Sequence, residues 1–163
     1  MQGPQLLKAT RQSAILALLA CSVFAAQPES FTFAGLNLKT TMADLKKRYP
    51  SSMALDTLVY LSDKESHDHI STIGLSSNGA ARTLTITFEQ QRQGSATYPS
   101  CEQSLSRLKE RYGNPTNVAN TQEERARNRR FEWTTATESL TLNCFQMPRQ
   151  PLNAERLTIT SSR

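Results

Sequence analysis

The sequence is short of the residues from which most enzyme sites are built. Its 163 residues include two histidines, three cysteines, one tryptophan and six glycines. It has no G-x-S-x-G turn, no glycine-rich phosphate loop and no C-x-x-C pair. Ser106 and Lys109 match S-x-x-K, but they stand inside an amphipathic helical pattern and the partner motifs of that enzyme class are missing. We therefore predict a non-catalytic protein that uses no cofactor.

A long hydrophobic run is also missing. The longest apolar run covers residues 14–24, and a helix needs about 20 residues to cross a bilayer. Lys8 and Arg11 precede this run, and small residues follow it, which is the plan of a secretory signal peptide. We expect a leader over 1–25 and one mature domain over 26–163.

Two cleavage sites compete in the leader. Val23 and Ala25 are small residues at the positions that an ordinary signal peptidase reads, which would release the chain into the periplasm at Ala26. Residues 18–21 resemble a bacterial lipobox, which would instead make Cys21 a lipidated first residue anchored to the outer membrane. We favour release, because Leu19 is bulkier than the usual lipobox residue.

Either cleavage leaves only Cys101 and Cys144 in the folded part. An oxidising compartment permits a disulfide, and two cysteines allow only one pairing. The alternative is a reactive thiol, since Cys101 stands at an expected helix N-terminus, where the pKa of a thiol falls. We predict the disulfide.

The charge of the mature chain is close to balanced. Removing the two leader residues from the 19 lysines and arginines leaves 17, against 14 aspartates and glutamates. This small excess is not typical of a nucleic-acid-binding protein. The many threonines in alternating runs favour antiparallel strands with one solvated face.

A repeat runs along the chain. The segments MADLKKRYP from Met42 and LSRLKERYG from Leu105 share apolar positions 63 residues apart, spaced as on a short amphipathic helix. Thr41 with Asp44, and Ser100 with Gln103, resemble helix-capping boxes. Pro50 and Gly113 mark the helix ends.

Three expected strands follow each helix. They cover 58–63, 69–77 and 81–90 in the first unit, and 129–135, 139–145 and 155–162 in the second. RTLTITF and RLTITSS match at an offset of 73, so the second unit has ten extra residues, which we assign to a loop over 117–127. We also expect an extra strand over 31–38. The predicted fold is α+β: two tandem αβββ units, about 31–93 and 94–163, forming an antiparallel sheet with two short helices packed on it.

This order of elements resembles the tandem-repeat β-lactamase-inhibitor proteins, and a single unit resembles the small outer-membrane assembly lipoproteins of the BamE type. The resemblance rests on the order of elements, and no family residue can be carried over. It implies a sheet face that holds another protein, and no catalysis.

The densest group of metal-ligand residue types is DKESHDH, residues 63–69. On a strand, His67 and His69 would share a face and could bind a metal such as zinc, with Asp63 or Glu65 as a further ligand. This would make the chain a small-ligand or metal carrier, which is the alternative function. A solvated hairpin loop explains the same residues.

The most promising surface lies in EERARNRRFEW, residues 123–133. In an extended chain Arg125, Arg127 and Arg129 line one face, with Arg130 and Trp133 beside them. Arginine and tryptophan are enriched at binding hot spots. We predict a binding surface for an acidic protein partner or an anionic envelope component. A solvated edge strand explains the arginines equally well, and Trp133 alone could be core.

These observations predict a periplasmic binding module. Its partner is expected to be a protein with an acidic surface in the envelope, and its role that of an inhibitor, an immunity protein or an assembly factor.

Overall fold

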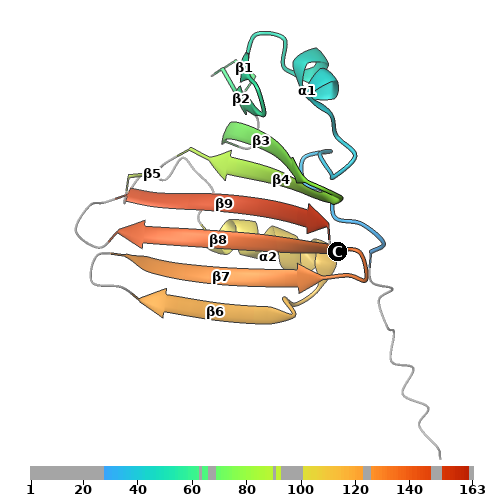
Figure 1. Cartoon of the computed structure of the whole chain (residues 1–163). Helices are drawn as coiled ribbons and strands as arrows, with labels where there is room; N and C mark the ends of the chain where they lie inside the picture. The colour runs from blue at the N-terminus through green and yellow to red at the C-terminus, as the bar shows by residue number, and fades with distance from the viewer. Residues whose placement is uncertain are drawn as a thin grey trace, which may run out of the picture.

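The computed structural model describes residues 28–62, 64–65, 69–89, 91–92, 101–122, 126–147 and 152–161. The expected leader, with Cys21, lies outside these residues. The described chain forms one large antiparallel sheet and two short helices (Figure 1), which agrees with the predicted α+β class. None of its helices has the length and apolar character that a membrane-spanning helix requires.

The two helices form where the apolar stripes predict them. Helix α1 covers Met42–Arg48 and begins with the predicted capping box, in which Thr41 Oγ1 accepts from Asp44 N at 3.2 Å and Thr41 N donates to Asp44 Oδ2 at 2.9 Å. Helix α2 covers Cys101–Tyr112 and ends at Gly113, whose φ of 78° suits glycine. The stripe residues Leu45 and Leu108 are buried.

Nine strands build the sheet in the part of the chain that the structure describes. They are β1 Met53–Leu55, β2 Leu58–Tyr60, β3 Ile70–Asn78, β4 Ala81–Phe88, β5 Gln91–Arg92, β6 Asn117–Gln122, β7 Arg127–Thr134, β8 Glu138–Met147 and β9 Leu152–Ser161. Their spatial order is β1-β2-β3-β4-β9-β8-β7-β6, with β5 paired to β9. Along the chain, strands β1–β5 follow α1 and strands β6–β9 follow α2. Three strands had been expected after each helix.

Two local expectations were wrong. Most of the loop expected over 117–127 is strand β6, held by antiparallel pairing with β7. The segment expected to be a strand over 31–38 forms a tight turn instead. In this turn the backbone N–H of Phe33 donates to the Leu36 oxygen, and the backbone N–H of Leu36 donates to the Phe33 oxygen. The chain reverses there because Ala34 and Gly35 take φ values of 48° and 73°, which an extended strand does not allow.

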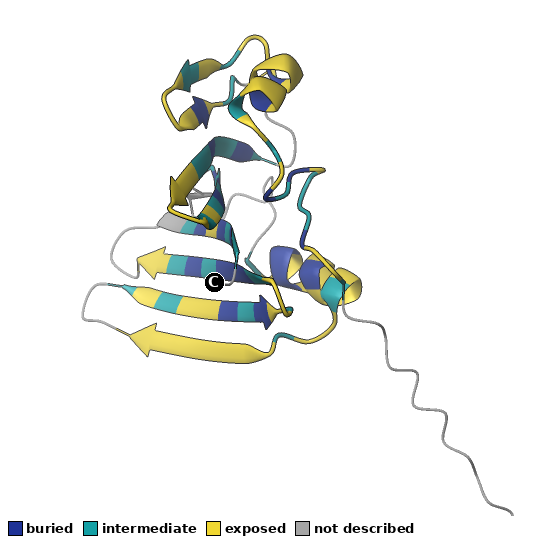
Figure 2. Cartoon of the chain, turned by 45° about the vertical axis from the view of Figure 1, so that its right-hand side comes forward, coloured by how far each residue is buried: buried dark blue, intermediate teal, exposed yellow. Residues whose placement is uncertain are grey.

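The core lies on one face of the sheet. Along β4, Leu84, Ile86 and Phe88 are buried, while the threonines between them are half-buried on the other face. Both helices and the 28–41 segment lie on the buried side, which Figures 1 and 2 show from two directions. No described helix or strand covers the opposite side. We call that side the open face.

The middle of the sheet is formed by β4 and β9, which are far apart in the sequence. Leu84 pairs with Ile159, Thr85 with Thr158 and Ile86 with Leu157. The buried leucines and isoleucines of this seam are fully covered on the helix side. The seam joins the part of the chain that contains α1 to the part that contains α2.

Candidate binding surfaces

The predicted arginine strip is divided between the two faces of β7. The pairing with β8 places Arg129 opposite Cys144 on the helix side, and the alternation places Arg127 there too. Arg130 pairs with Asn143 and lies on the open face. All three arginines are exposed. Arg125 lies outside the described residues, so its place in the strip stays a prediction.

Trp133 is a core residue, and the contact role predicted for it is wrong. It is only 2% exposed and pairs with Leu140 across the β7–β8 ladder. Its indole Nε1 donates to the backbone oxygen of Gly113 at 2.9 Å, which ties β7 to the end of α2. The physical reason is the strand's alternation, which buries Phe131 and Trp133 together beneath the helix.

Each arginine that has an acidic partner remains in contact with solvent. Arg129 forms an ion pair with Glu102 of α2, and its guanidinium lies 5.1 Å from the ring centroid of Phe131. Arg130 lies 3.5 Å from Glu132, two residues along the same strand. Exposed pairs of this kind contribute about 0–1 kcal/mol each, so they leave the arginines available to a partner.

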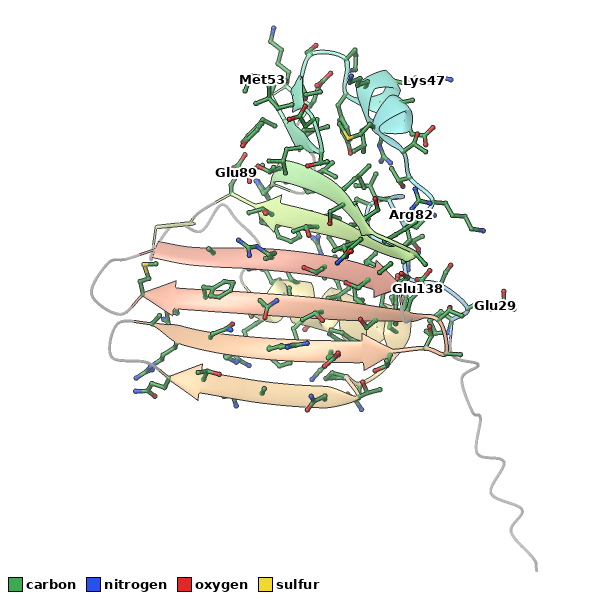
Figure 3. All side chains as sticks on the ribbon, in the orientation of Figure 1. Glu29, Lys47, Met53, Arg82, Glu89 and Glu138 are labelled. Atoms are coloured by element: carbon green, nitrogen blue, oxygen red, sulfur yellow. A yellow bond between two sulfur atoms is a disulfide. The ribbon has the colours of Figure 1, made fainter. Side chains whose placement is uncertain are left out.

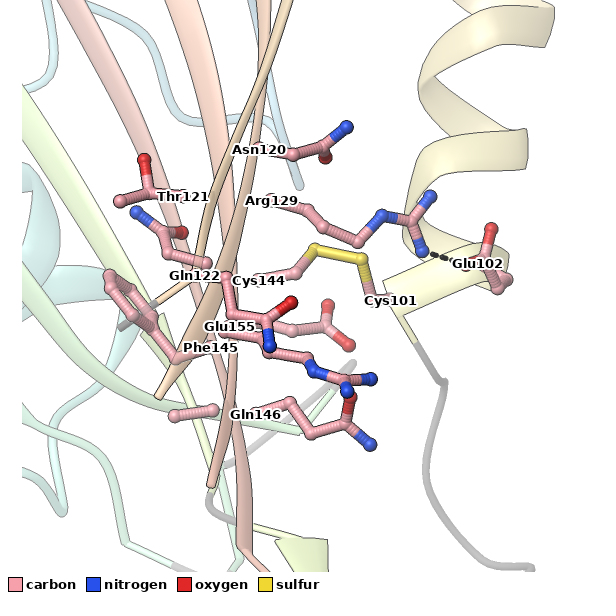
Figure 4. Close-up of a pocket in the computed structure, with 13 residues that line it drawn as sticks. Cys101, Glu102, Asn120, Thr121, Gln122, Arg129, Cys144, Phe145, Gln146 and Glu155 are labelled. Atoms are coloured by element: carbon pink, nitrogen blue, oxygen red, sulfur yellow. Dashed lines mark hydrogen bonds and ion pairs between the residues drawn. A yellow bond between two sulfur atoms is a disulfide. The ribbon is translucent and has the colours of Figure 1, made fainter. Parts of the chain in front are cut away.

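The predicted disulfide is present. Cys101, the first residue of α2, is bonded to Cys144 of β8, with their Cα atoms 5.9 Å apart. The bond holds the N-terminal end of α2 against the sheet beside Arg129 (Figure 4). Because both sulfurs are in the bond, the alternative of a reactive Cys101 thiol does not apply to this structure.

A cavity of about 830 Å³ opens next to the disulfide, between the start of α2 and the ends of β6–β9 (Figure 4). It is lined by side chains of both charges, including Glu102, Arg127, Arg129 and Glu155, and by several amides. Its charges nearly cancel, so the cavity has no strong preference for an anion or a cation.

Glu155 is the one buried carboxyl of this cavity. It is 6% exposed, and its Oε2 accepts the Ser104 hydroxyl at 2.6 Å. Burial raises the pKa of Glu155 because the charged form loses its hydration, and the Ser104 hydrogen bond opposes this rise. The Glu155 carboxyl therefore links β9 to α2. Keeping this carboxyl buried costs more free energy when it is ionised than when it is protonated.

A second surface, which the sequence did not reveal, lies at the other end of the sheet. Met53, Leu55, Leu58 and Tyr60 are 58%, 52%, 37% and 41% exposed. Met53 pairs with Tyr60 and Leu55 with Leu58, so the four side chains lie on one face of the β1–β2 hairpin. We call them the apolar quartet; Met53 marks its place at the sheet edge in Figure 3.

The apolar quartet lies on the open face. Leu58 pairs with Gly74, and its Cδ2 lies 3.1 Å from the position that a Cβ on Gly74 would take. Val59, between Leu58 and Tyr60, is buried on the helix side. Gly74 thus gives Leu58 room to lie across the sheet, and a larger residue there would push it outward.

The histidine segment is only partly described. His69 stands at a φ of 58° just before β3, with its Nδ1 4.0 Å from Glu89 Oε2. His67 and Asp63 lie outside the described residues. Glu65 accepts from Ser51 N at 2.8 Å and from Ser52 Oγ at 2.5 Å, so it fastens a turn. Within the described chain no three histidine, cysteine or acidic residues form a metal-binding group.

No family model, curated protein or solved structure matches this chain.

Proposed function

We propose that this chain is a non-catalytic, exported binding module of the bacterial envelope, which holds a protein with an acidic surface against its open face. The observation that carries the proposal is the apolar quartet. Four large apolar side chains from adjacent strands are exposed together on a face that no described helix or strand covers.

Such a cluster is unusual on a protein that binds nothing. Single exposed leucines are common, whereas contiguous apolar patches on soluble proteins mark interaction surfaces. Tyr60 adds a residue type that is enriched at binding hot spots. The quartet supplies the water-excluding part of an interface.

The charges of the open face favour an acidic partner. The strand pairings place Arg130, Asn143 and Arg156 in one row across β7, β8 and β9. Glu132, which lies 3.5 Å from Arg130, is the acidic residue of that neighbourhood. The row is therefore net positive, and complementary charge would speed the encounter with an acidic surface. A role as an inhibitor, an immunity protein or an assembly factor in the periplasm fits this surface.

We further propose that the scaffold consists of two repeated units joined at the β4–β9 seam. Thr85 pairs with Thr158, which is also its equivalent at the offset of 73 found in the sequence. An antiparallel pair in which a residue faces its own equivalent is what a two-fold axis between two like units would produce. Each unit would then contribute one half of the open face.

The function is tested with a variant that disrupts the quartet, Leu58→Asp with Tyr60→Ser, and with Ala43→Asp as the matched control. Ala43 is exposed on α1, on the side of the sheet opposite the open face, and its replacement adds the same negative charge. Tagged protein is cross-linked in cells, and the captured proteins are identified and measured for affinity.

We expect a stoichiometric partner that the wild type and Ala43→Asp retain. The quartet variant should bind it about 30-fold more weakly, as removal of a hot spot does. Equal retention by all three proteins would refute the proposed surface. Metal that stays with the protein through gel filtration would instead support the carrier function.

A further inference from the structure

Strand β6 is an unprotected edge of the sheet. It pairs with β7 on one side, and no other described strand pairs with it on the other. All six of its residues, NVANTQ, are exposed, as Figure 2 shows along the whole strand. Its outer backbone groups therefore face solvent.

Edge strands usually carry devices that prevent pairing with other chains. Charged side chains, proline, bulges and very short length are the common ones. β6 has no charged residue and no proline, and its register with β7 runs without interruption from Asn117 to Gln122. The arginines that would serve as protection stand on β7, one strand further in.

We propose that β6 accepts an extended, acidic segment of the partner protein as an additional antiparallel or parallel strand. This deepens the proposed function by naming how the partner is held. Backbone hydrogen bonds to β6 would supply affinity, as in other cases of strand addition, and the arginines of β7 would supply the preference for acidic residues.

The positions of the arginines suit this arrangement. An added strand would lie about 10 Å from β7, two strand spacings away. On the open face the β6 residue opposite Arg130 is Ala119, whose short side chain leaves the guanidinium a path towards the edge. On the helix side, Arg127 stands opposite Gln122 near the end of the hairpin. Acidic residues on either face of the added strand would meet an arginine.

A second copy of this chain fits the same edge less well. Pairing β6 with β6 of another copy would place two arginine-bearing β7 strands on either side of the new seam. Like charges brought together there oppose the contact. The occupant favoured by charge is an acidic strand.

The test uses two synthetic peptides, one alternating valine with glutamate and one alternating valine with lysine. Binding to the isotope-labelled protein is followed by NMR shifts of the β6 amides and by titration at several salt concentrations. The variants are Ala119→Glu, which puts a negative charge beside Arg130, and the double reversal Arg127→Glu with Arg130→Glu. The matched controls are Asn78→Glu, and Lys46→Glu with Lys47→Glu, which make the same charge changes at exposed positions elsewhere.

We expect the glutamate peptide to shift the β6 amides of the wild type and of both controls. Its affinity should fall about tenfold or more in the Ala119→Glu and double-reversal proteins, and the double-reversal protein should bind the lysine peptide instead. Equal binding by all variants, or no shift at β6 with either peptide, would overturn the proposal. So would a dimer that Ala119→Glu dissociates, because β6 would then bind its own copy.

The peptide experiment can fail without the proposed function failing. The quartet variant Leu58→Asp with Tyr60→Ser leaves β6 unchanged, so it should bind the glutamate peptide normally while it loses the partner. Loss of both activities in the quartet variant would show that the two surfaces are not separate, and would overturn the assignment of the peptide to β6.

Discussion

Replacing Cys101 and Cys144 together with alanine should lower the free energy of unfolding by about 4 kcal/mol. The disulfide spans 43 residues of sequence, and the entropy of closing a loop of that length in the unfolded chain gives about this value. The loop contains α2, β6, β7 and part of β8, so without the bond the unfolded chain regains the freedom of most of the second half. The folded state should change little, because α2 is also held by Leu105 and Leu108 in the core.

Urea unfolding followed by the fluorescence of Trp133 measures this loss, because Trp133 is the only tryptophan and is buried in the folded state. The denaturant slope should rise, since a chain without a cross-link exposes more surface when it unfolds. Wild type reduced with a thiol is the control and should unfold like the double variant. A loss below about 1 kcal/mol, or a reduced wild type as stable as the oxidised protein, would refute the loop-entropy reasoning.

Three further predictions concern residues that hold α2 on the sheet. Trp133→Ala should lower the free energy of unfolding by about 3–5 kcal/mol. Trp133→Phe should cost less, mainly the hydrogen bond to Gly113, and circular dichroism can follow both. Because burial raises the pKa of Glu155, the folded state binds its proton more tightly than the unfolded chain does. The resulting stability is present below the unfolded pKa and declines as the pH rises through the folded pKa. Urea midpoints over a pH series should show this decline in the wild type and not in Glu155→Gln. Gly113→Ala should lose about 1 kcal/mol in the same assay, because its φ of 78° strains any residue with a Cβ.

The helices were predictable because their signals are local. The apolar spacing around Leu45 and Leu108 and the capping residues Thr41 and Asp44 depend only on neighbours in the sequence. The disulfide followed from counting, since the two cysteines of the expected mature domain can pair with each other in only one way. The threonine-rich strands β4 and β9 were also predictable, because the alternation of apolar and polar residues along a strand is a local signal too.

Strand β6 was missed because its sequence has no such signal. NVANTQ is exposed at every position, so no buried face imposes alternation, and the strand is held by its ladder with β7. The error over 31–38 is the opposite one: a strand was predicted where none forms. The segment has apolar residues that are buried, but a turn at Ala34 and Gly35 buries them instead of a strand.

The apolar quartet shows what an alternating sequence pattern cannot predict, which is the face of the strand that becomes buried. A period of two in LVY separates Val59 from Leu58 and Tyr60 but does not say which side becomes the core. The packing of β2 against β3 decides that Val59 is buried and its neighbours are exposed. Trp133 does share a face of β7 with Arg127 and Arg129, but alternation does not say how far along the strand that face is buried.

The position of β9 has a consequence for how the chain reaches this fold. Strand β9, the last strand of the described residues, lies between β4 and β8, so both of these keep an unpaired inner edge until residues 152–161 join them. Pairings over such sequence distances form slowly, because the intervening chain must first be ordered. A chain that stops before residue 152 would lack β9, which lies in the middle of the sheet. Chains that stop early would therefore present two facing edges to each other and to other copies, and aggregation is the expected result.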